Sequence, residues 1–176
     1  MYARSTALAA VTAVALIVPA DHAPRFTLGA SGAVTISTAG TEVHYGRLPD
    51  LDGQGARITV SLGATNPGGS LVLTMNAEDL PIPGKYAVTD DWKATGPAFH
   101  AALVAGSATH PVGWFEGVTG TVTVTDTADG ELSGEFEIQG RGWLSDNPDD
   151  ENRWVTVRGS FHTGPASGNS GILTLQ

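Results

Sequence analysis

The chain has 176 residues, with 9 basic and 18 acidic side chains, a formal net charge of −9 and no cysteine. The lack of cysteine excludes disulfides and thiolate chemistry, so an exported form of the chain would depend on a true hydrophobic core. An acidic surface repels nucleic-acid phosphates and anionic lipids, which excludes nucleic acid as an expected partner.

The first twenty residues are typical of a secretory signal peptide. Arg4 is their only charge, residues 7–18 form an apolar run, and Val18-Pro19-Ala20 supplies small residues at the cleavage position. The run is too short for a typical membrane span. We expect cleavage after Ala20 and a secreted product, extracellular or periplasmic, without membrane contact. An uncleaved anchor is the alternative. The mature 156 residues would carry 8 basic and 18 acidic side chains, a net charge of −10.

Short runs of alternating apolar and polar residues follow, and each predicts a strand with one buried face. Before residue 105 they lie at 25–28, 33–37, 42–45, 58–62, 71–75 and 85–89. The turn sequence Asn66-Pro67-Gly68-Gly69 would join two of them into a hairpin. Residues 99–104 fit either a strand or one helical turn, because they are rich in alanine.

The clearest strand pair lies in residues 117–140. Val122 and Val124 alternate with threonines, and Phe136 and Ile138 alternate with glutamates after a turn that contains Asp-Gly. Residues 112–115 lead into this hairpin and residues 153–161 follow it. The alternation predicts one core that contains Val122, Val124, Phe136, Ile138, Val157 and Phe161.

About nine or ten short strands without a long amphipathic helix predict an all-β fold, either an antiparallel β-sandwich or a barrel. We expect a single domain over residues 21–163. Residues 164–176 would form a Gly/Ser-rich linker and a tail, or an edge strand at 172–175.

Three segments resemble a group of small exported bacterial β-domains of unknown function, whose pattern is sGTVTIT, then isGtFsF, then VTVtnGtF. The segments are GTVTVTDTADGELSGEFEIQGRG, VTVRGSFHT and the upstream PIPGKYAV, within residues 81–163. The resemblance implies the fold and leaves the function open. The chain departs from the group in lacking the cysteine anchor that is common there.

The loop 145–152, SDNPDDEN, carries Asp146, Asp149, Asp150 and Glu151. Several carboxylates on one loop could hold Ca²⁺, which prefers six to eight oxygen ligands. The Asp-x-Asx-x-Asx-Gly spacing is missing, because Pro148 and Glu151 occupy its third and sixth positions. We therefore expect a solvated acidic loop and no cofactor, with a Ca²⁺ site as the alternative.

Trp143 and Trp154 flank this loop, and a register that sets them opposite each other also sets Phe136 opposite Phe161. The two indoles would then share a face with Arg141 and Arg158 and could stack on a sugar or an apolar ligand. The alternative is that they cover the sheet or pack under the loop. We expect Trp92 and Trp114 to be packing residues.

Glu135 and Glu137 are the candidates for acid–base catalysis. Two positions apart on one strand, their side chains would lie about 7 Å from each other, within the range that glycosidases use. Arg141 and Arg158 are near enough to pair with them, and nothing marks a pocket around them. We assign no catalytic residue.

These features predict an exported, non-enzymatic β-domain that acts as a binding or structural module, with a protein or a carbohydrate as its partner. One alternative is a lipocalin-like carrier of a small apolar ligand. Another is a small secreted hydrolase or lyase that uses surface carboxylates. A large enclosed cavity would favour the carrier, and a cleft with convergent carboxylates would favour the enzyme.

Overall fold

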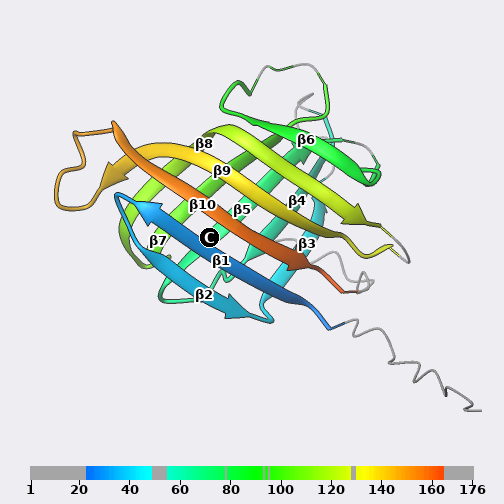
Figure 1. The fold of residues 1–176 in the computed structure, drawn as a ribbon, viewed down its shortest axis with the longest axis horizontal. Helices are drawn as coiled ribbons and strands as arrows, with labels where there is room; N and C mark the ends of the chain where they lie inside the picture. Colours follow the sequence, from blue (N-terminus) through cyan, green and yellow to red (C-terminus); the bar gives the residue numbers. More distant parts are fainter. Residues whose placement is uncertain are drawn as a thin grey trace, which may run out of the picture.

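The computed structural model describes residues 23–48, 55–77, 79–92, 94, 96–127 and 130–164. This part of the chain is all-β, and its ten strands form one sheet that curves into a nearly closed barrel (Figure 1). The predicted signal peptide and the predicted strand at 172–175 lie outside the described residues. Within those residues, no helix is long and apolar enough to cross a bilayer.

The strands follow one another with short connections and pair in the order β2-β1-β10-β9-β8-β6-β7-β5-β4-β3. Their bounds are β1 (Arg25–Gly32), β2 (Ile36–Gly40), β3 (Val43–Leu48), β4 (Arg57–Leu62), β5 (Gly69–Asn76), β6 (Gly84–Thr89), β7 (Phe99–Ser107), β8 (His110–Asp126), β9 (Ser133–Leu144) and β10 (Arg153–His162). The predicted hairpins 58–75 and 117–140 are therefore confirmed.

Several strands run further than the sequence indicates. β1 continues through Gly29 to Gly32, where a break was expected, and β2 begins only at Ile36. The Ala-rich segment at 99–104 belongs to the nine-residue strand β7 and not to a helical turn. For β1 and β7, sheet pairing on both sides outweighs local propensity, because it provides partners for the backbone groups of these residues.

β8 is the longest strand and organises the sheet. It pairs with β9 along most of its length, while its other edge pairs first with β7 and then with β6. A register shift between Gly117 and Thr119 marks the change of neighbour. This bulge adds a residue to β8 and lets the strand bend around the barrel.

The barrel closes where β1 and β2 approach the β4–β5 turn. The Asn66 amide donates to the Thr38 hydroxyl over 2.7 Å, and the Gly63 N–H donates to the Glu42 carbonyl over 2.9 Å. The Glu42 carboxylate accepts bonds from the Thr65 hydroxyl and N–H, and the hydroxyl bond contributes most to lowering the pKa of that carboxyl. The Asn66–Thr38 bond thus joins β2 to the β4–β5 turn across the seam that the backbone ladder leaves open, whereas the Gly63 bond continues the β3–β4 pairing by one residue.

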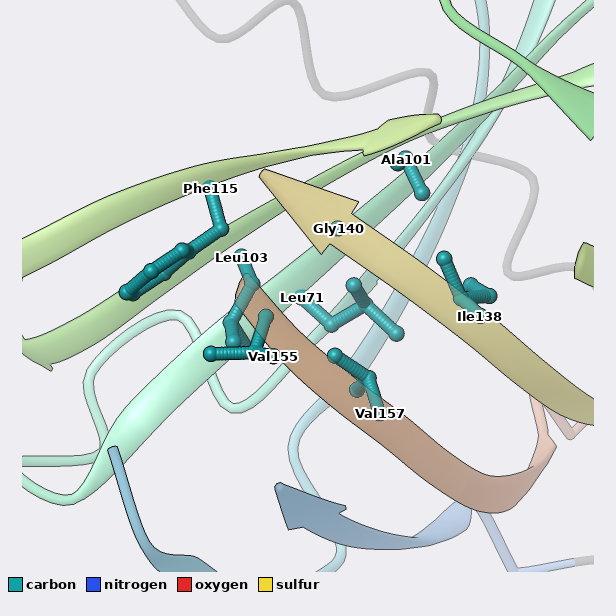
Figure 2. A pocket seen from close by; sticks show the side chains of 9 residues that line it. Leu71, Ala101, Leu103, Phe115, Ile138, Gly140, Val155 and Val157 are labelled. Carbon is teal, nitrogen blue, oxygen red and sulfur yellow. The ribbon is translucent and has the colours of Figure 1, made fainter. Parts of the chain in front are cut away.

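Apolar side chains fill the interior. All six residues predicted for the core are buried there: Val122, Val124, Phe136, Ile138, Val157 and Phe161. Figure 2 shows side chains from β5, β7, β8, β9 and β10 converging on a cavity of about 10 Å³, including Leu71, Leu103 and Phe115. A space of this size holds about one water molecule, so the barrel has a packed core at this place.

The predicted register between β9 and β10 is wrong by two residues. Phe136 lies opposite Gly159 and Phe161 opposite Gly134, whereas the expected register set the two phenylalanines opposite each other. A Cβ on Gly134 would lie 2.8 Å from the Phe161 ring, and one on Gly159 would lie 2.6 Å from the Phe136 ring. The interior of a small barrel is narrow, so each ring needs a glycine across from it.

Candidate ligand-binding face

Three tryptophans lie on the outside of neighbouring strands. Trp114 of β8 is directly opposite Trp143 of β9, and Trp154 of β10 is directly opposite Arg141 of β9. Trp143 and Trp154 are thus diagonal neighbours, not the directly opposed pair that the sequence suggested. Trp114 is 39% exposed and Trp154 is 47% exposed, while Trp143 is half-buried. Trp114, which the sequence suggested as a packing residue, therefore lies on the outer face of the sheet.

Close approach of β8 and β9 brings two of these indoles together. A Cβ on Gly142 would collide with the Trp114 carbonyl oxygen, and one on Gly113 would lie 2.8 Å from the Trp143 carbonyl oxygen. Glycine at both positions therefore permits the pairing of Trp114 with Trp143. Directly opposite residues of this kind have Cβ atoms about 4.5–5.5 Å apart, so the two indoles emerge next to each other on the outer face of the sheet.

Polar side chains adjoin the indoles. Arg141 lies between Glu116 of β8 and Trp154 of β10 in one row across the sheet, and both Glu116 and Arg141 are exposed. We call the set Glu116, Trp114, Trp143, Arg141 and Trp154 the tryptophan face. It combines flat apolar rings with a guanidinium donor and a carboxylate acceptor, which suits a ligand that has both apolar and hydroxyl-bearing surfaces.

An open groove of about 530 Å³ continues from the tryptophan face along the outside of the sheet. Its lining comes from β6, β8, β9 and β10 and includes Lys85, Thr121, Gln139, Glu137 and Arg158. Gln139 is two residues from Arg141 and points to the same side of β9. We call this the outer groove. The predicted site residue Arg158 lines this groove and lies on the same sheet face as Trp143, Trp154 and Arg141.

The two candidate catalytic carboxylates lie in the outer groove, both exposed on the same side of β9 as expected. Glu137 accepts a 2.6 Å bond from the Arg158 guanidinium, and that bond lowers the pKa of the Glu137 carboxyl. A general acid needs the opposite shift, because it must hold its proton near neutral pH. The pairing therefore favours a binding role for Glu137 over an acid role.

The acidic loop connects β9 to β10, as expected. Asp150 binds the Arg153 side chain over 2.7 Å and accepts a bond from the Asn152 N–H, whereas Asp146, Asp149 and Glu151 are exposed. In the described part of the chain, no three histidine or carboxylate side chains gather as a metal-binding group would. The expected solvated loop without a cofactor stays a prediction, and the Ca²⁺ site stays its alternative.

A polar cluster at the other end of β9 was not predicted from the sequence. The Ser133 hydroxyl lies 2.7 Å from His162 Nδ1, and His162 Nε2 lies 3.5 Å from a Glu131 carboxylate oxygen. The Leu132 and Thr163 backbones also bond to each other here. The order serine, histidine, glutamate resembles a nucleophile with its base, but neither the outer groove nor the interior cavity is lined by these residues. We assign the cluster to closing this end of the barrel.

A second histidine lies under an exposed indole. The Trp92 ring stacks on the His100 ring with 3.8 Å between centroids and 9° between planes. Trp92 is 53% exposed, so it packs as expected but from the outside. His100 is buried, and its Nδ1 has no hydrogen-bond partner. Burial lowers the pKa of His100, although a backbone bond to Thr89 acts in the other direction.

Comparison of the chain with known protein families, curated proteins and solved structures finds no match in any of the three. The resemblance to small exported bacterial β-domains therefore stays a prediction.

Proposed function

We propose that the protein is an exported, non-enzymatic binding domain that holds a carbohydrate on its tryptophan face. The observation that supports the proposal is the cluster of three indoles on the outer side of β8, β9 and β10, two of them 39% and 47% exposed. Exposed clusters of aromatic residues beside polar groups are typical of interaction sites, and this cluster therefore supports a partner outside the chain.

A sugar ring matches the chemistry of this face. One side of a pyranose presents C–H groups that can lie flat on an indole, and its hydroxyls can both donate and accept hydrogen bonds. Arg141 and Glu116 lie beside the rings as donor and acceptor. A ligand site commonly combines aromatic contact area with a few such polar groups.

The two alternatives receive less support from the geometry. A carrier of a small apolar ligand needs an enclosed pocket of roughly 300 Å³ or more, while the cavity among the core side chains is about 10 Å³. A hydrolase that uses surface carboxylates needs one with a raised pKa, and Glu137 has the opposite shift through Arg158.

Binding to a panel of polysaccharides tests the proposal. Affinity electrophoresis would cover soluble glucans, mannans and xylans, and pull-down would cover cellulose and chitin. We expect at least one to bind, and Trp154→Ala to weaken that binding about tenfold, the effect of losing one aromatic contact. Trp92→Ala is the matched control, because Trp92 is also exposed but lies outside the tryptophan face. Binding that survives Trp114→Ala/Trp154→Ala unchanged would refute the site.

Export is a separate part of the proposal and rests on residues 1–20 alone. Intact mass of the protein recovered from the periplasm or the medium should correspond to a chain that begins at Asp21. A recovered species that retains the first twenty residues would contradict cleavage without affecting the binding site.

A further inference from the structure

We infer that the outer groove extends the tryptophan face into one elongated site for an uncharged, linear glycan. The inference rests on the proposed function and adds two properties to it: the ligand is a chain and not a single sugar, and it carries no net charge. Three features of the outer face support it: its length, the chemistry of its lining and its charge balance.

The two surfaces form one continuous strip on β9. Outward positions of this strand run from Trp143 through Arg141 and Gln139 to Glu137 and Glu135. At about 3.3 Å per residue, the strip is roughly 26 Å long. A single sugar ring would cover only the tryptophan face, so the remaining length and the 530 Å³ groove have room for further rings.

The lining of the groove favours hydroxyl groups over an apolar chain. Threonine hydroxyls at positions 119, 121 and 123 of β8 face the Gln139 amide and the carboxylates of β9 across the sheet. Each threonine hydroxyl can donate or accept a hydrogen bond, as a sugar hydroxyl can. A peptide that adds as an extra strand is a poor fit, because β9 is paired on both edges and its backbone groups are already used.

The charge of the strip argues against a charged ligand. The chain as a whole has a net charge of −9, yet the tryptophan face and the outer groove together carry equal numbers of basic and acidic side chains. The basic side chains are Lys85, Arg141 and Arg158, and the acidic side chains are Glu116, Glu135 and Glu137. A site for an acidic polysaccharide would need an excess of cations, and a site for a basic partner would share the acidity of the chain.

The experiment measures affinity against chain length by isothermal titration calorimetry. The probes are cello-, xylo- and manno-oligosaccharides from disaccharide to hexasaccharide, with oligogalacturonate as the anionic comparison. We expect affinity to rise at least tenfold from the shortest to the longest member of the binding series, and to stay within about twofold between low and high NaCl, because screening acts on charged ligands.

Two variants separate the parts of the site. Thr121→Val/Gln139→Ala removes hydrogen-bonding groups from the outer groove and should weaken the hexasaccharide about tenfold while leaving the disaccharide unchanged. Trp154→Ala should weaken both. An unchanged melting temperature and circular dichroism spectrum would confirm that each variant is folded.

The outcomes distinguish the inference from the proposed function. Affinity that does not depend on chain length, together with loss of binding in Trp154→Ala, would overturn the elongated site and leave the tryptophan face in place. Salt-sensitive binding of oligogalacturonate above the neutral series would overturn the uncharged ligand. If no oligosaccharide or polysaccharide binds, the proposed function and this inference both fail.

Discussion

The inner and outer faces of β9 and β10 use aromatic residues in opposite ways. Inside, Phe136 and Phe161 each lie over a glycine of the neighbouring strand and are almost completely buried. Outside, Trp154 is 47% exposed and lies opposite a charged residue, Arg141. The inner rings are explained by packing within the chain. The outer rings are not, and this contrast is why we look for their partner outside the molecule.

The largest expected effect is on the inner face. Phe136→Ala should lower the free energy of unfolding by about 3–5 kcal/mol, because the ring is 4% exposed and its loss leaves a cavity. Urea denaturation followed by circular dichroism measures the change. An unfolding midpoint within error of the parent would mean that Phe136 contributes little to the core and that the contrast between the faces is false.

The pairing of β9 with β10 could be predicted only in part. Alternation with period two indicated which side chains face inward, and the six predicted core residues are all buried. Registers two residues apart keep the same faces, so the pattern could not choose between them. The choice depends on the width of the interior, where Phe136 needs Gly159 opposite. That width follows from barrel closure and cannot be predicted from the sequence of any one strand.

The candidate site was predicted less completely than the core. The sequence placed Trp143, Trp154, Arg141 and Arg158 on one face, and the structure confirms that placement. Trp114 was missed because the glycines around it and the bulge after Gly117 interrupt the alternation of β8. Ser133 and His162 are 29 positions apart and meet only through the strand register.

A smaller effect should come from the glycines opposite the inner rings. Gly159→Ala would place a Cβ 2.6 Å from the Phe136 ring and against the Thr27 carbonyl oxygen. We expect a loss of about 1–3 kcal/mol, typical of overpacking. Gly46→Ala is the matched control, because no atom lies within 4 Å of the Cβ it would add. If both variants unfold at the same urea concentration, the ring-over-glycine packing does not set the register.

A third effect concerns His100, which lies outside both faces and under Trp92. Its pKa in the folded protein is lowered from 6.5 chiefly by burial, with repulsion from Arg57 adding to it and Asp90 and Asp91 opposing it. As the pH falls below 6.5, His100 binds a proton in the unfolded chain but not yet in the folded chain. The free energy of unfolding should therefore decrease. The same linkage at Glu42 and Glu137 acts only below their ordinary value of 4.5.

The free energy of unfolding should therefore fall between pH 6.5 and 5 in the parent and much less in His100→Gln. His110→Gln is the control, since His110 is exposed. Trp92 fluorescence in a variant that retains this tryptophan alone would report whether the stacked pair separates at low pH. Equal slopes in the parent and His100→Gln would show that burial of His100 does not govern the acid response.

The smallest expected effect on stability is the one that matters most for function. Trp154→Ala should change the free energy of unfolding by no more than about 0.5–1 kcal/mol, because an exposed ring loses little burial and one cross-strand contact. Together with the large effect of Phe136→Ala, this would show two aromatic side chains on adjoining strands, one that contributes strongly to folding and one that contributes little. A loss of several kcal/mol in Trp154→Ala would instead make the indole part of the fold, and its exposure would no longer call for a ligand. Chemical denaturation of the two variants side by side decides between these outcomes before any ligand is known.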